Sequence, residues 1–397
     1  MKSKSLKRFL IIAGALIIGL LLVFILSIAG SESKGPIQST LDGIANKVLD
    51  LENQYIFQKR SKKRKQKLKV FSSFKNDINA LKHPKIILLG ASDQIEKESF
   101  EAIINLEDSL RTTFPLIHIY NAWGSKPTEQ FPTLAVETII KLGSTPVITW
   151  EPWLDDFNEE DYPGIPKPAK RKKGCLKAIA DGTYDKYIFE WAKDLAKIKL
   201  PIFIRWAHEM NDPYRYPWGP QNNKYEDFTN AWKHIRDVFR YAGANNAIWI
   251  WAPHPAYGHL DDYYPGEKLV DYIGIGVLNF GIATTWSKWW TFDQLFGKSY
   301  EKVDSFSKPV MITEFGSLNV GGDRSQWFSD AMQSIAFEYP AIKAVMFFHQ
   351  NADKTITDKE VSWYFIEDKK SKEAIIRQLK SWPDSLKLEN LKHNIKK

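Results

Sequence analysis

The stretch PIFIRWAHEMN at residues 201–211 shows the pattern that decides the fold, because a continuous apolar run ends in charged and polar side chains. Continuous apolar strands that alternate with amphipathic helices indicate a parallel sheet buried on both faces. Eight such runs indicate that the sheet closes into a (β/α)8 TIM barrel. They are KIILLGAS (85–92), LIHIYNAWG (116–124), TPVITWEPW (145–153), PIFIRWAHEMN (201–211), AIWIWAPH (247–254), DYIGIGVLN (271–279), PVMITEFG (309–316) and IKAVMFFHQ (342–350).

An open, doubly wound sheet is the alternative to a barrel. That fold usually carries a glycine-rich phosphate loop after its first strand, and none follows the run at 85–92. In a barrel the carboxyl ends of all strands meet on one face, where active sites are built. Polar and aromatic residues gather at these ends: Asn121, Trp123, Trp150, Glu151, His208, Glu209, His254, Asn279, Glu314 and His349.

Two of these residues, Glu209 and Glu314, end the fourth and the seventh run. Those run ends lie across the mouth of an eight-stranded barrel, so we expect the carboxylates to approach within about 5 to 5.5 Å. Cleavage of a glycosidic bond with retention needs one protonated carboxylic acid and one carboxylate at about that separation. A lone glutamate at a strand end is usually a surface or salt-bridge residue, but two in matching runs indicate an active site.

The motifs around these glutamates resemble glycoside hydrolase family 26. RWAHEMN is followed by YPWG, then YYPGEKLVDYIGI, then MITEFG, and the resemblance covers roughly residues 85–370. It implies an endo-acting enzyme on a β-1,4-linked polysaccharide, β-mannan first among them. By position it implies Glu209 as general acid/base and Glu314 as nucleophile.

The resemblance also implies a set of substrate-binding residues. His208 would contact the sugar next to the cut, Arg205 and Asn211 would support it, and Trp218 in YPWG would be a sugar platform. Flat aromatic faces suit pyranose rings of a neutral polysaccharide. We therefore add residues at run ends and in the aromatic loop at 280–292 to the expected set: Trp150, Asn279 and Trp286.

One position departs from the family pattern. The family usually places a tyrosine on the sixth strand, where its hydroxyl bonds the nucleophile, but Leu278 stands at the aligned position here. Tyr257 or Tyr120 is the alternative source of that hydroxyl. This departure keeps two other functions open: a β-1,3-1,4-glucanase or exopolysaccharide-processing hydrolase of the same family, and a catalytically inactive barrel that binds glycan at a membrane.

No metal or cofactor is expected. The acidic stretch DDFNEED at 155–161 lacks the spacing of a calcium loop, and the histidines show no HExxH or comparable zinc spacing. No GxSxG motif is present, which disfavours a serine hydrolase. The single cysteine, Cys175, excludes an intramolecular disulfide.

The N-terminus carries a membrane signal. Residues 9–29 are uncharged and long enough, at 1.5 Å per residue, to cross the roughly 30 Å hydrocarbon core of a bilayer. The basic segment at 1–8 places the N-terminus in the cytoplasm and the remainder on the extracytoplasmic side. A cleaved signal peptide is the alternative, because Ser27 and Ala29 fit a small-x-small cleavage site.

The rest of the chain divides into three expected parts: a helical and basic stalk or cover of the barrel bottom at 30–84, the barrel at 85–385, and a polar tail at 386–397. The net charge of +8 comes largely from short basic runs such as 61–69. No nucleic-acid-binding module is recognisable, so the expected partners are a polysaccharide and a membrane. A coiled coil in the stalk would be too short to fix an oligomeric state.

Overall fold

The computed structural model describes residues 47, 51, 63–93, 100–355 and 358–388. The expected cytoplasmic segment at 1–8 and membrane segment at 9–29 lie outside these residues and stay predictions. Within the described part of the chain, no helix has the length and apolar character needed to cross a membrane.

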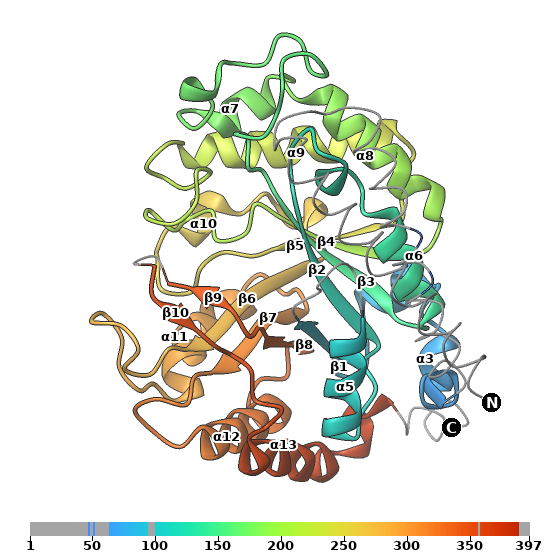
Figure 1. Cartoon of the computed structure of the whole chain (residues 1–397), viewed down its shortest axis with the longest axis vertical. Helices are drawn as coiled ribbons and strands as arrows, with labels where there is room; N and C mark the ends of the chain where they lie inside the picture. The colour runs from blue at the N-terminus through green and yellow to red at the C-terminus, as the bar shows by residue number, and fades with distance from the viewer. Residues whose placement is uncertain (1–46, 48–50, 52–62, 94–99, 356–357, 389–397) are drawn as a thin grey trace, which may run out of the picture. The chain divides into compact units, whose positions relative to one another are not determined.

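Eight parallel strands form a closed barrel in which each strand pairs with the next and β8 pairs with β1. This confirms the predicted TIM barrel and excludes the open sheet (Figure 1). The strands are β1 Leu88–Asp93, β2 Leu116–Ala122, β3 Thr145–Glu151, β4 Ile202–Trp206, β5 Ala247–Trp251, β6 Tyr272–Asn279, β7 Val310–Ser317 and β8 Ile342–His349.

Helices follow the strands and cover the outside of the barrel. In α9, apolar residues three or four positions apart face the barrel, and Phe228, Trp232 and Phe239 are buried. The helices are α3 Lys69–Ser72, α4 Ile78–Lys82, α5 Glu101–Leu110, α6 Thr133–Lys141, α7 Cys175–Ala180, α8 Asp185–Ile198, α9 Tyr225–Tyr241, α10 Leu260–Tyr263, α11 Phe292–Asp304, α12 Arg324–Phe337 and α13 Lys369–Ser381. A short hairpin, β9 Asp353–Lys354 and β10 Glu360–Val361, comes after β8.

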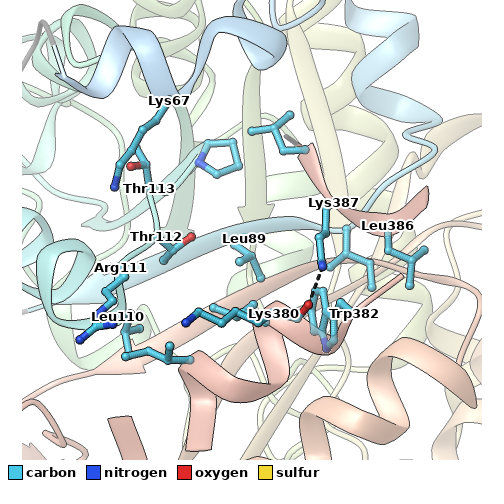
Figure 2. Close-up of a pocket in the computed structure, with 15 residues that line it drawn as sticks. Lys67, Leu89, Leu110, Arg111, Thr112, Thr113, Lys380, Trp382, Leu386 and Lys387 are labelled. Atoms are coloured by element: carbon cyan, nitrogen blue, oxygen red, sulfur yellow. Dashed lines mark hydrogen bonds between the residues drawn. The ribbon is translucent and has the colours of Figure 1, made fainter. Parts of the chain in front are cut away.

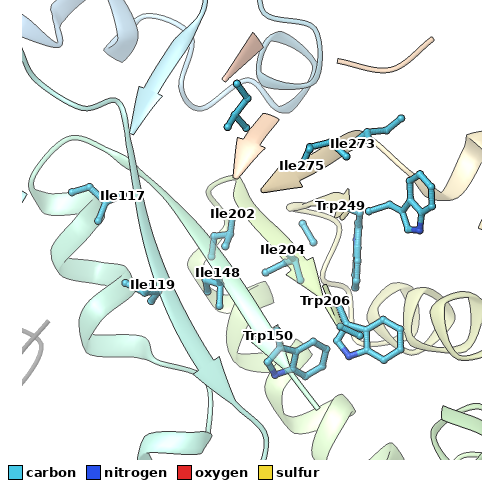
Figure 3. Close-up of a cluster of buried hydrophobic side chains, with 14 of the residues drawn as sticks. Ile117, Ile119, Ile148, Trp150, Ile202, Ile204, Trp206, Trp249, Ile273 and Ile275 are labelled. Carbon is cyan, nitrogen blue, oxygen red and sulfur yellow. The ribbon is translucent and has the colours of Figure 1, made fainter. Parts of the chain in front are cut away.

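The core has two layers because successive side chains of a strand point to opposite faces. One cluster fills the barrel interior and includes Leu88, Phe203 and Met311. A larger cluster lies between the strands and the helices, and Figure 3 shows part of it, with Trp150 and Trp206. Alternation along β3 and β4 therefore sends these tryptophans outward and leaves their neighbours facing the interior.

The segment before β1 closes the bottom of the barrel. Leu68, Phe71 and Leu81 belong to the interior cluster, so for residues 63–82 the structure shows a cover rather than a free stalk. Arg64, from the basic run, is buried and pairs with Glu107 at 2.5 Å. The basic run at 61–69 is thus not wholly exposed to solvent. The compact unit that holds the barrel begins before residue 85.

Candidate active site

Glu314 lies at the carboxyl end of β7, and a β-bulge turns it into the barrel mouth. The pairing register of β7 shifts after Ile312, which lies in the outer core layer, as does Phe315. The two residues between them, Thr313 and Glu314, both bond Arg205 inside the barrel. Bulges commonly re-aim side chains beside active sites.

One oxygen of Glu314 accepts two hydrogen bonds. Arg205 Nη2 donates to Glu314 Oε1 at 2.6 Å, and the Tyr120 hydroxyl donates to the same oxygen at 2.8 Å. Among the described residues, the other oxygen, Oε2, has no hydrogen-bond partner. Glu314 therefore has one anchored and one available oxygen.

Arg205 is itself held rigidly in the barrel interior. Its Nε donates to Thr149 Oγ1 at 2.6 Å and its Nη1 donates to Thr313 Oγ1 at 3.1 Å. His118 Nε2 lies 2.6 Å from the same Thr149 hydroxyl, and burial holds the pKa of His118 well below its usual value. A neutral histidine next to the guanidinium leaves Glu314 as the natural counter-ion of Arg205.

These contacts determine the charge of Glu314. Burial alone would raise its pKa, but the charge and hydrogen bond of Arg205 and the hydrogen bond of Tyr120 outweigh burial, so the pKa lies below its ordinary value. Burial and the Glu314 charge raise the pKa of Tyr120, which keeps its phenol protonated as a donor. Glu314 is the ionised carboxylate of the site.

Glu209 follows β4 in a strained turn. Its φ is 54° and that of Ala207 is 44°, a left-handed region that costs a residue other than glycine about 1–2 kcal/mol. Its backbone N–H donates to the Ala252 carbonyl at 2.7 Å, which fixes the turn to the end of β5. Such strain is often found at functional sites.

The two carboxylates meet beside Gly276 on β6. A Cβ atom at Gly276 would lie 3.7 Å from Glu209 Oε1 and 3.9 Å from Glu314 Oε2. The sum of these distances, 7.6 Å, is an upper limit for the separation of the two oxygens. This limit is compatible with the spacing of about 5–5.5 Å between the carboxyl groups of retaining glycosidases.

The pKa of Glu209 moves opposite to that of Glu314. Burial raises it, and the negative charge of Glu314 adds to the increase, while the electrostatic interaction with His254 opposes it in part. A third carboxyl, Glu151 at the end of β3, has a pKa raised to about 7 by burial. The mouth thus holds a carboxyl group whose pKa is raised beside a carboxylate whose pKa is lowered, the pairing that acid/base tuning requires.

His208 and Trp218 form a buried support and not a sugar platform. The prediction that Trp218 faces the ligand is wrong, because this side chain has no exposed surface. It stacks on Tyr216 with centroids 4.6 Å apart, and its Nε1 donates to the His208 carbonyl at 2.7 Å. His208 is buried too, with Nε2 2.9 Å from the Tyr216 hydroxyl. Tyr216, which sequence reasoning missed, links the two.

The two asparagines of the expected set hold loops. Asn211 Nδ2 donates to the His254 and Tyr257 carbonyls, and its Oδ1 accepts from the His254 N–H, which agrees with a supporting role. Asn279 is buried and bonds Ser317 and the backbone at Gly281 and Trp290. Its predicted contact with substrate is wrong, since its polar atoms hold the loop that leads to α11.

The other expected tryptophans differ from each other. Trp150 is fully buried in the outer core layer and stacks on Trp191 with centroids 4.4 Å apart, so its predicted contact with substrate is also wrong. Trp286 is 53% exposed and packs edge-on against Phe280. Of the three tryptophans in the expected substrate-binding set, only Trp286 offers an exposed face.

The hydroxyl expected from the sixth strand comes from β2. Leu278 packs with Trp363 and Phe348 in a small apolar cluster, and Tyr120 supplies the hydrogen bond to Glu314. Tyr257, the other proposed source, packs on His254 instead. Of the two alternatives, the structure therefore selects Tyr120.

Among the described residues, one group of side chains has donor atoms close enough for a metal: those of Glu209, Asp212 and His254 lie within 4.8 Å of one another. His254 Nδ1, however, accepts the Ala256 N–H at 3.1 Å, which leaves the proton of a neutral imidazole on Nε2. A protonated Nε2 donates hydrogen bonds and does not ligate metal. The group fits hydrogen bonding around Glu209 better than metal binding.

Comparisons with known proteins agree with this geometry. The model of glycosyl hydrolase family 26 matches residues 150–358, which is more than half of the chain. Endoglucanase H of Acetivibrio thermocellus is 30% identical over 274 residues, which are 67% of this chain and 27% of that protein. A mannan endo-1,4-β-mannosidase of Bacillus subtilis strain 168 is 24% identical over 179 residues, 43% of this chain and 42% of that protein.

The solved structures show the same fold. A family 26 β-mannanase from Bacteroides ovatus superposes with a TM-score of 0.53 at 17% identity, over 77% of this chain and 92% of that one. The chain spans less than half the length of the two curated relatives named above. Motifs, barrel and family match lead to one conclusion: the chain belongs to glycosyl hydrolase family 26.

Proposed function

We propose that this chain is a retaining, endo-acting β-glycoside hydrolase that cleaves a β-1,4-linked polysaccharide, with β-mannan as the first substrate. Glu209 is the general acid/base and Glu314 is the nucleophile. The observation that carries the proposal is the pair of neighbouring carboxyl groups with opposite pKa shifts: burial raises the pKa of Glu209, whereas Arg205 and Tyr120 lower the pKa of Glu314.

The reaction takes two steps. Glu314 Oε2, which has no described hydrogen-bond partner and faces Gly276, attacks the anomeric carbon while Glu209 protonates the leaving oxygen. The glycosyl ester is then hydrolysed by a water whose proton passes to Glu209. Arg205 and Tyr120 hold the other oxygen of Glu314 throughout, which fixes the attacking geometry.

The choice of substrate rests on relatives and not on geometry. The mannosidase name favours β-mannan, while the name endoglucanase of the 30% identical relative favours a β-glucan as the second candidate. An inactive glycan-binding barrel is disfavoured, because two acidic groups buried together raise the free energy of the fold unless they have a use.

Azide rescue separates the roles of the two glutamates. Glu209→Ala and Glu314→Ala are assayed on an activated aryl glycoside with and without sodium azide, and products are identified by NMR. Azide should restore turnover of Glu209→Ala with a β-glycosyl azide as product, because the glycosyl-enzyme still forms. It should restore Glu314→Ala through direct attack, with an α-glycosyl azide as product.

The unmodified chain is incubated with β-mannan, mixed-linkage β-glucan and xylan, and new reducing ends are counted. If the chain binds one or more of these glycans but produces no new reducing ends from any of them, the enzyme proposal is contradicted and the glycan-binding barrel is supported. An α-azide from Glu209→Ala, or a β-azide from Glu314→Ala, reverses the two roles.

The location is part of the proposal: residues 9–29 anchor the protein in a membrane with the barrel on the extracytoplasmic side. The uncharged run and the basic segment before it support this. Alkaline extraction of membranes and protease treatment of intact cells test it. Release of the protein at high pH, or an N-terminus that starts after Ala29, contradicts the anchor.

A further inference from the structure

A cavity of about 340 Å³ lies beside the start of β1, and Figure 2 shows the residues that line it. It is lined by the start of β1, the turn between α5 and β2, the end of α13 and the chain that follows α13. Strand starts form the bottom face of the barrel, whereas Glu209 and Glu314 are at strand ends. The cavity is therefore separate from the catalytic mouth.

The rim of this cavity is cationic. Four of its lining residues are basic and none is acidic: Lys67, Arg111, Lys380 and Lys387. Lys387 Nζ donates to the Lys380 carbonyl at 2.7 Å and lies 3.7 Å from Asp384, which is outside the lining. No hydrogen bond or ion pair joins the charged ends of Lys67, Arg111 and Lys380 to other described residues. Within the described residues, the cavity thus has three cations without a hydrogen-bonded or ion-paired partner, and the charge of Glu107 acts on Lys67 among them.

The walls below this rim are apolar. The apolar lining combines buried side chains, among them Ile87, Leu110 and the ring of Trp382, with half-buried ones, among them Leu89, Ile376 and Leu379. Burial of hydrocarbon against such walls favours binding, because it removes apolar surface from water. The ligand that matches both parts is an amphiphile with an anionic head and a hydrocarbon body.

The neighbouring chain segments match the cavity poorly in charge. The tail after Leu388 carries Lys392, Lys396 and Lys397 against the single acid Glu389, and the stretch just before Lys63 carries Lys59, Arg60 and Lys62. Both would add positive charge to a rim that is already positive. Charge complementarity therefore favours an external anion over either segment.

We propose that this cavity binds an acidic phospholipid, with the phosphate between Arg111, Lys380 and Lys67 and the first part of an acyl chain on the apolar walls. The site is independent of glycan cleavage.

The test uses the full chain in phosphatidylcholine nanodiscs, titrated with water-soluble dihexanoyl phosphatidylglycerol below its micelle concentration. Dihexanoyl phosphatidylcholine and glycerol 3-phosphate are the comparison ligands. Binding is followed by hydrogen exchange of residues 110–115 and 376–388. We expect saturable protection by the acidic lipid and at least about tenfold weaker binding of the other two ligands.

The double variant R111Q/K380Q should bind the acidic lipid at least about tenfold more weakly. The matched control is K370Q/R377Q, which removes two cations from α13 that do not line the cavity, and it should bind normally. Leu379→Trp, which fills the hollow and keeps its charges, should abolish binding. Polysaccharide hydrolysis should be unchanged in all of them and reports on folding.

Three results overturn the proposal. Equal binding of the acidic and the zwitterionic lipid shows that the cations do not recognise an anionic headgroup. Glycerol 3-phosphate that binds as tightly as the lipid leaves an anion site without a role for the apolar walls. Unchanged binding by R111Q/K380Q shows that the lipid binds elsewhere.

Discussion

Replacement of Tyr120 by phenylalanine removes one hydroxyl and should move the acidic limb of the pH–activity profile to higher pH. The hydroxyl donates to ionised Glu314 at 2.8 Å, and a hydrogen bond to a charged group contributes about 1.5–3 kcal/mol. Arg205 remains on the same oxygen at 2.6 Å, so we take the lower value. About 1.5 kcal/mol corresponds to about one pKa unit.

The direction follows from the folded-state pKa of Glu314, which lies below its ordinary value. The nucleophile works only when ionised. The hydrogen bond from Tyr120 lowers the pKa of Glu314, so its loss raises that pKa. Activity then falls off at a higher pH than in the unmodified chain. Activity well above this limb should fall less, because the carboxylate is then ionised in both proteins.

The assay is kcat/KM against pH on a soluble oligosaccharide. Tyr257→Phe is the matched control, because Tyr257 packs on His254 and does not bond Glu314. We expect its acidic limb to coincide with that of the unmodified chain. An unshifted limb in Tyr120→Phe, or an equal shift in Tyr257→Phe, refutes the reasoning.

Four further substitutions test other parts of the structure. Arg64→Met leaves the Glu107 carboxylate buried without its partner, so the free energy of unfolding in a urea titration should fall by about 3–5 kcal/mol, and a loss below 1 kcal/mol contradicts a buried ion pair. Gly276→Val places methyl groups between the carboxylates and should lower kcat/KM at least about 100-fold with little change in Tm, whereas near-normal turnover shows that substrate does not pass there. Trp286→Ala should raise KM about two- to tenfold with kcat nearly constant, because Trp286 is exposed. Trp150→Ala should lower the free energy of unfolding by about 3–5 kcal/mol without a specific effect on KM, because Trp150 is buried. A stability loss in Trp286→Ala together with a KM effect in Trp150→Ala contradicts these positions.

The strand pattern predicted the barrel because buried parallel strands are apolar on both faces and helices separate them. The same property hid the direction of individual side chains. In TPVITWEPW, uniform apolar character cannot show which alternate residues face inward, so Trp150 was expected at the mouth although its neighbour Thr149 faces the interior. Trp218 was misplaced for a related reason, since a Pro/Gly loop around a tryptophan does not show that Tyr216 covers it.

The Glu209 and Glu314 positions could be predicted because each ends a strand on the active face. The partner of Glu314 could be reduced to two tyrosines but not chosen, because Tyr120 precedes Glu314 by 194 residues and meets it only through barrel closure. The bulge at Thr313 also had no sequence signal. A contact or register that depends on distant segments is fixed by the three-dimensional arrangement and not by local pattern.

The central claim is that Glu314 forms a covalent bond with the sugar. The chain is incubated with a 2,4-dinitrophenyl 2-deoxy-2-fluoro-β-glycoside, whose fluorine slows hydrolysis of the glycosyl ester, and the product is mapped by peptide mass spectrometry. We predict one added glycosyl group per chain, on Glu314. Attachment at Glu209 or Glu151, or turnover to an inverted product without any label, contradicts the account.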